Sequence, residues 1–85
     1  MGMEVISLKW IRQKAMDKIY RGISPTKEDV ELIKRWFKIM VGNLEKFEKL
    51  GKENVVKLIR DELATARKYC EVMGIKDELS EFYKK

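Results

Sequence analysis

Pairs of carboxylates are the first feature of this sequence whose type and spacing could do chemistry. Glutamates three residues apart share one face of a helix, and three such pairs occur: Glu28/Glu31, Glu45/Glu48 and Glu78/Glu81. A di-iron site in a helical bundle needs Glu-x-x-His motifs on inward faces, and the chain contains no histidine. The pairs therefore indicate solvated positions at helix ends, and we expect no metal site.

Other catalytic groups are equally scarce. Histidine, the commonest general base, is absent, and the single cysteine, Cys70, falls on an apolar seam where it reads as a small buried hydrophobe. We expect no enzyme, no cofactor and no small-molecule ligand. Catalysis by Arg, Lys and Glu side chains in an oligomeric helical bundle is the one exception left open.

The charge of the chain is unevenly distributed. Lys and Arg number 19 against 14 Asp and Glu, and residues 1–22 carry five basic and two acidic side chains. Within them a possible nucleic-acid contact follows one stripe, formed by Trp10, Lys14, Lys18 and Arg21. Elsewhere the charges alternate in sign, which is typical of solvated helix faces. The alternative is that the stripe is such a face, with Trp10 packed under a chain terminus.

Apolar periodicity predicts a single all-α domain over residues 1–85, with helices at about 7–21, 25–50, 52–73 and 77–83. Ser7 and Ser24-Pro25 are the start signals, and Gly22, Gly51 and Gly74 are stop signals. Two seams advance in alternating steps of three and four: Val30, Ile33, Phe37, Met40, Leu44 and Phe47, then Val56, Ile59, Leu63, Ala66, Cys70 and Met73.

Two matched seams joined by a tight turn predict a long antiparallel helical hairpin. The fold class is therefore a small helical bundle of three main helices plus a short C-terminal helix. Leu32, Trp36, Ile39 and Leu50 widen the apolar arc of the second helix, so we expect that helix to lie in the middle and contact both the first and the third.

The first helix is too short to cover the whole hairpin, so the turn end of the hairpin is expected to lack a third helix. Its apolar residues form a candidate oligomer or partner interface: Val41, Leu44, Phe47, Leu50, Val55 and Val56. Alternatively, Met3, Val5 and Ile6 or a bend at Gly42 closes this end within one chain.

Two charges lie within apolar arcs. Arg12 in the first helix and Glu62 in the third are candidates for a buried ion pair with each other, or for pairing with charges of a partner chain, because a lone charge on a core face is costly. The alternative is that each side chain lies at the edge of its arc and reaches water.

These features together favour a non-enzymatic helical protein–protein interaction module that associates with itself or with another helical protein. The alternative is a small basic nucleic-acid-binding protein that uses its first helix. No apolar run approaches the ~18 residues of a membrane span and no signal peptide is visible, so we expect a cytoplasmic protein with no membrane partner. Abundant Lys, Glu and Ile with few Asn and Gln fit a heat-adapted source.

Overall fold

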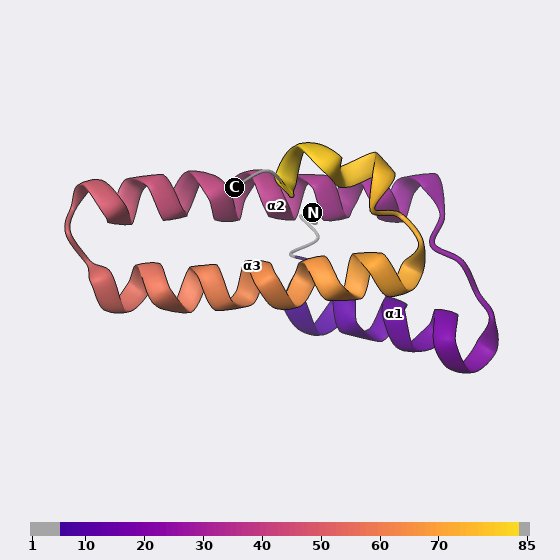
Figure 1. The fold of residues 1–85 in the computed structure, drawn as a ribbon. Coiled ribbons are helices and arrows are strands. Elements are labelled where there is room, and N and C mark those ends of the chain that lie inside the picture. Colours follow the sequence, from indigo (N-terminus) through magenta and orange to yellow (C-terminus); the bar gives the residue numbers. More distant parts are fainter. Residues whose placement is uncertain (1–5, 84–85) are drawn as a thin grey trace, which may run out of the picture.

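The computed structural model describes residues 6–83 as three α-helices followed by a short 3-10 helix (Figure 1). The elements are α1 (Leu8–Arg21), α2 (Lys27–Lys49), α3 (Glu53–Met73) and η1 (Asp77–Phe82). α2 and α3 form an antiparallel hairpin, and no strand occurs among the described residues. The predicted fold class is confirmed. The predicted contribution of Met3 and Val5 to the first helix lies outside the described residues.

Hydrogen-bonded caps define where α1 and α2 begin. The Ser7 hydroxyl accepts a hydrogen bond from the backbone N–H of Trp10, as predicted. α2, however, is capped by Thr26, which forms a capping box with Asp29: each side chain accepts from the other's backbone N–H, at 3.1 and 3.0 Å. The prediction that Ser24 caps this helix is wrong, since its hydroxyl instead accepts a hydrogen bond from Lys18 Nζ.

The short C-terminal helix that was predicted is present, and it is a 3-10 helix. Gly74 ends α3 in the left-handed conformation, with φ of 77°, and the N–H of Ile75 then donates to the carbonyl of Cys70. This turn directs the chain back over the hairpin, where Leu79 and Phe82 become buried. η1 therefore supplies core side chains despite its short length.

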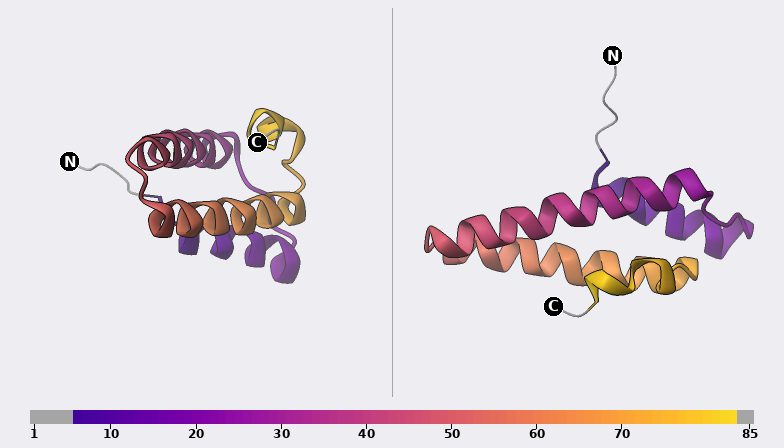
Figure 2. Two further views of the ribbon diagram at one scale, coloured as in Figure 1. Left: turned by 60° about the vertical axis from the view of Figure 1, so that its left-hand side comes forward. Right: turned by 90° about the horizontal axis from the view of Figure 1, so that it is seen from above.

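α3 is the central helix of the structure. α1 packs against α3, and α2 packs against α3 and η1, so the prediction that the second helix lies in the middle is wrong. The connection of residues 22–26 has no regular structure, and it carries the chain from α1, on the far side of α3, across to the start of α2 (Figures 1 and 2). Periodicity alone does not specify which helix covers which apolar face.

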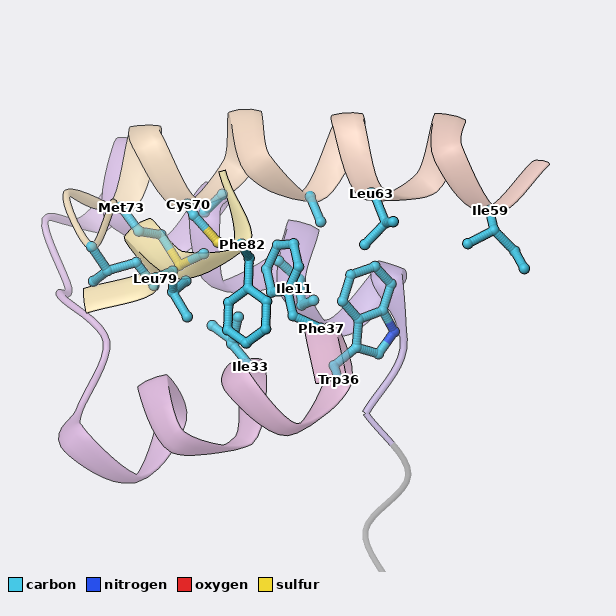
Figure 3. Close-up of a cluster of buried hydrophobic side chains, with 13 residues drawn as sticks. Ile11, Ile33, Trp36, Phe37, Ile59, Leu63, Cys70, Met73, Leu79 and Phe82 are labelled. Atoms are coloured by element: carbon cyan, nitrogen blue, oxygen red, sulfur yellow. The ribbon is translucent and has the colours of Figure 1, made fainter. Parts of the chain in front are cut away.

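The core is one cluster of buried apolar side chains centred on Phe37 (Figure 3). The Phe37 ring stacks on Phe82 and meets Trp36 edge to face, both at centroid distances of 5.2 Å. The other buried members are Ile11, Ala15, Ile33, Ile59, Leu63, Ala66, Cys70, Met73, Ile75 and Leu79. All three helices and η1 contribute, so the described elements share a single core.

Gly42 neither interrupts α2 nor permits a close contact. The helix continues through it from Lys27 to Lys49, and no other part of the described chain lies within 4 Å of the place where a Cβ would stand. A bend at Gly42 does not close the turn end of the hairpin. Glycine at this exposed helical position instead leaves the helix with a conformational-entropy cost.

Replacing Gly42 with alanine is expected to raise the free energy of unfolding by about 0.5–1 kcal/mol, because alanine removes that cost without a clash. Urea denaturation of the wild type and G42A measures the change. Gly74→Ala is the contrasting variant and should destabilise the chain, because Gly74 has a φ of +77° that L side chains rarely adopt. A destabilised G42A protein would show that Gly42 contacts something outside this chain.

Candidate interaction surface at the hairpin tip

Burial is confined to one end of the hairpin. The last buried side chain of α2 is Phe37 and the first of α3 is Ile59, so no side chain from Lys38 to Leu58 is buried. α1 and η1 both lie towards the opposite end, on opposite sides of the hairpin (Figures 1 and 2). Among residues 6–83, the turn end therefore consists of two helices alone.

The structure brings the six predicted interface residues together at this turn end, and we call them the tip cluster. Leu50 is 58% exposed. The other five are only partly buried: Val41, Leu44, Phe47, Val55 and Val56. Because no third helix of the described part of the chain covers them, the tip cluster forms an incomplete apolar layer.

Two further exposed apolar side chains near the tip cluster were not among the predicted interface residues. Ile39 on α2 is 63% exposed and Leu58 on α3 is 62% exposed. Ile39 belongs to the wide apolar arc of α2 that was expected to pack on the first helix. Since α1 packs on α3 instead, the apolar arc of α2 is left partly uncovered. The width of this arc is the sequence signal that could have identified Ile39 as exposed.

A groove runs between α2 and α3 on the tip. Its inner hollow, of about 340 Å³, has Val41, Leu44 and Leu63 among its lining residues. An ion pair of 2.7 Å between Glu48 and Arg60 lies at the border with a second hollow nearer the turn. Both charged side chains are exposed, so the pair contributes roughly 0–1 kcal/mol and leaves the groove accessible.

Arg67 marks the inner limit of this groove, where η1 is attached. Its Nε donates to the Phe82 carbonyl at 3.0 Å, and the Tyr83 hydroxyl donates to the Arg67 carbonyl at 2.6 Å. Burial, together with the nearby Cys70 and Glu71, raises the pKa of Tyr83 to about 12. The phenol is therefore protonated near neutrality and holds the end of η1 against α3.

The predicted nucleic-acid stripe is largely engaged in contacts within the chain. Lys14 Nζ lies 5.1 Å from the centre of the Trp10 ring and pairs with Asp29 at 3.4 Å. Trp10 is half-buried, and Lys18 donates to Ser24 at 2.9 Å. Lys14 and Lys18 therefore connect α1 to the segment that leads into α2, through their contacts with Asp29 and Ser24.

Arg12 and Glu62 do not form a buried ion pair. Both residues are exposed, and no charged side chain is buried among the described residues. Each lies at the edge of an apolar arc, where a long side chain reaches water and avoids the cost of burying a charge. The prediction of a buried pair is therefore wrong.

The described residues hold no group of three or more carboxylate or cysteine side chains that could bind a metal ion. Cys70 is fully buried, and burial raises the pKa of its thiol to about 12, so it stays protonated near neutrality. Within residues 6–83, no helix combines the length and apolar character needed to cross a membrane.

No protein-family model, curated protein or solved structure matches this chain, so the chemistry of its surfaces is the basis for inferring a function.

Replacing Asp29 with asparagine tests the contacts that join α1 to the start of α2. Burial alone would raise the pKa of Asp29. The hydrogen bond from the Thr26 N–H and the positive charge of Lys14 together lower the pKa by more than burial raises it, so the pKa lies below the ordinary value of 3.8. The ionised carboxylate therefore stabilises the fold above pH 3.8, and this contribution is lost as the pH falls through the folded-state pKa.

We expect D29N to lower the free energy of unfolding by about 1 kcal/mol at neutral pH, and the difference from the wild type to shrink below pH 3.8. Urea denaturation at the two pH values measures both. The matched control is Glu31→Gln, which changes an exposed carboxylate paired only with Lys34 along the helix surface. A D29N effect independent of pH would contradict the electrostatic account.

Proposed function

We propose that this protein is a helical self-assembly module in which the tip clusters of two copies pack together. The observation that supports it is the lack of any buried side chain between Lys38 and Leu58. That stretch nevertheless contains nine large apolar residues: Ile39, Met40, Val41, Leu44, Phe47, Leu50, Val55, Val56 and Leu58. Helices of this kind owe most of their stability to packing an apolar face, and here that packing is incomplete.

A two-fold pairing of hairpins supplies the missing layer. Two antiparallel helix pairs packed face to face form a four-helix bundle, the common arrangement for seams of this spacing. α1 and η1 lie towards the other end of each chain, so they leave the turn end free for a partner (Figure 1). Two copies can therefore pack at the tip without rearranging their cores.

The apolar side chains exposed near the turn end favour association. Ile39, Leu50 and Leu58 are each more than half exposed, which gives six such side chains in a pair of chains. Burying a side chain of this size contributes roughly 1.5–3 kcal/mol, against an association cost of about 4–15 kcal/mol. The half-buried tip residues add to the favourable side, so we expect a dimer that depends on protein concentration.

Electrostatics neither drive nor prevent this pairing. Charged residues of both signs flank the tip cluster: Glu45, Lys46, Glu48, Lys49, Lys52, Glu53 and Lys57. Interspersed signs avoid a strong repulsive field between copies, and apolar burial is insensitive to moderate salt. The association should therefore survive an increase in ionic strength, unlike binding to nucleic acid, which weakens steeply with salt.

Light scattering of the purified chain at low and high salt tests the proposal. We expect a dimer at both, and Leu50→Glu should raise the dissociation constant about thirtyfold or more, because it buries a charge in the interface. Leu50 is already exposed, so this change leaves the monomer core intact, as circular dichroism can verify.

The matched control is Tyr20→Glu, which places the same charge at an exposed position on α1 and should leave the dimer unchanged. Phe47→Glu should act like Leu50→Glu. A wild-type chain that stays monomeric at all concentrations, or equal effects of Leu50→Glu and Tyr20→Glu, would contradict pairing through the tip.

A further inference from the structure

α1 combines an excess of basic side chains along its length with high apolar exposure at its C-terminal end. α1 carries five basic side chains and a single carboxylate, that of Asp17. At its end, Ile19 is 52%, Tyr20 79% and Ile23 54% exposed, and we call these three residues the α1 end patch. No other stretch of the described residues brings three such exposed side chains within five positions of the sequence.

The shape of the molecule makes the patch accessible. α1 extends past the neighbouring ends of α2 and α3, as both the front view and the view from above show (Figures 1 and 2). The patch therefore stands at the edge of the bundle, where a flat surface can reach it. The tip cluster lies at the opposite end of the hairpin.

The backbone fixes the patch in place. Gly22 ends α1 with a φ of 69°, and its N–H donates to the Lys18 carbonyl at 3.1 Å. The N–H of Ile23 then donates to the Asp17 carbonyl at 3.2 Å. These bonds fix the backbone of Ile23 directly beyond the helix end, close in sequence to Ile19 and Tyr20.

Cations border this patch, and the nearest carboxylate on α1 is partly shielded. Arg21 is exposed, and Lys18 is half-buried beside Ser24. Asp17 is half-buried and accepts a hydrogen bond from Gln13 Nε2 at 3.2 Å. On α1, two cations and one partly shielded carboxylate therefore adjoin the exposed apolar side chains.

We propose that the α1 end patch docks on an anionic lipid bilayer surface. Aliphatic side chains such as Ile19 and Ile23 gain by entering the boundary between headgroups and acyl chains. Tyr20 suits the headgroup layer, since its ring is apolar and its hydroxyl polar. Lys18 and Arg21 lie where they attract lipid phosphates.

Nucleic acid shares the phosphate chemistry but fits this surface less well. Tyr20 could stack on a base, yet two exposed isoleucines gain little from a phosphate backbone. The sequence-based expectation of no membrane partner was drawn from the lack of a membrane-spanning segment, and a surface contact needs none. Three side chains and a few cations predict weak, reversible binding that depends on salt.

Cosedimentation of the full chain with vesicles tests the proposal. We expect binding to vesicles of phosphatidylcholine mixed with phosphatidylglycerol, little binding to phosphatidylcholine alone, and weaker binding at high salt. Tyr20→Ser and Ile23→Ser should each weaken binding about fivefold, and Arg21→Glu by about twentyfold, since it changes the charge by two units.

Two control variants separate the patch from other surfaces. Ile39→Ser removes an equally exposed isoleucine from α2 and should leave vesicle binding unchanged. Leu50→Glu, which is designed to abolish pairing through the tip, should still bind vesicles through each monomer. Its binding therefore distinguishes this inference from the proposed assembly. Circular dichroism of each variant verifies that the helices remain folded.

Three results would overturn the inference. They are no binding to phosphatidylglycerol vesicles, binding that ignores salt and lipid charge, and an equal loss of binding in Ile39→Ser. Single-stranded DNA serves as the competing probe. If it binds and Tyr20→Ser weakens it, while vesicles are not bound, the patch is a nucleic-acid contact instead.

Discussion

The stacking of Phe37 on Phe82 is the contact on which the rest of the structure depends. It joins α2 to η1, while Trp36 closes the edge of the same ring, and Ile11 from α1 lies in the same cluster (Figure 3). Because this packing lies in the first half of α2, the covering elements gather there. The same arrangement leaves the turn end of the hairpin without buried side chains.

Local signals in the sequence predicted the helices well and their packing less well. Glycine stops and apolar steps of three and four placed α1, α2 and α3 within two residues of their observed ends. The start of α2 was missed because Thr26 and Asp29 satisfy two backbone donors at once, which outweighs a Ser-Pro start signal. Periodicity shows that a helix has an apolar face, but it does not show which neighbour covers it.

The candidate surfaces also divide into one that the sequence predicted and others that depend on how the helices pack. The tip cluster was predictable because helix lengths alone leave the turn end uncovered. The exposure of Ile39 and of the α1 end patch was not, since both depend on α1 packing against α3. Arg12 and Glu62 show a related limit: a position at the edge of an arc lets a long side chain reach water, and a shift of a few tens of degrees decides the outcome.

The unequal burial along α2 gives one continuous helix two different local stabilities. Its first half is anchored by Ile33, Trp36 and Phe37, whereas its second half has no buried side chain. Opening from the turn inward therefore exposes little apolar surface and costs less than global unfolding, so amides near the turn should form a separate cooperative unit in hydrogen exchange. A partner that covers the tip would raise the free energy of that local opening, because binding stabilises only the closed helices.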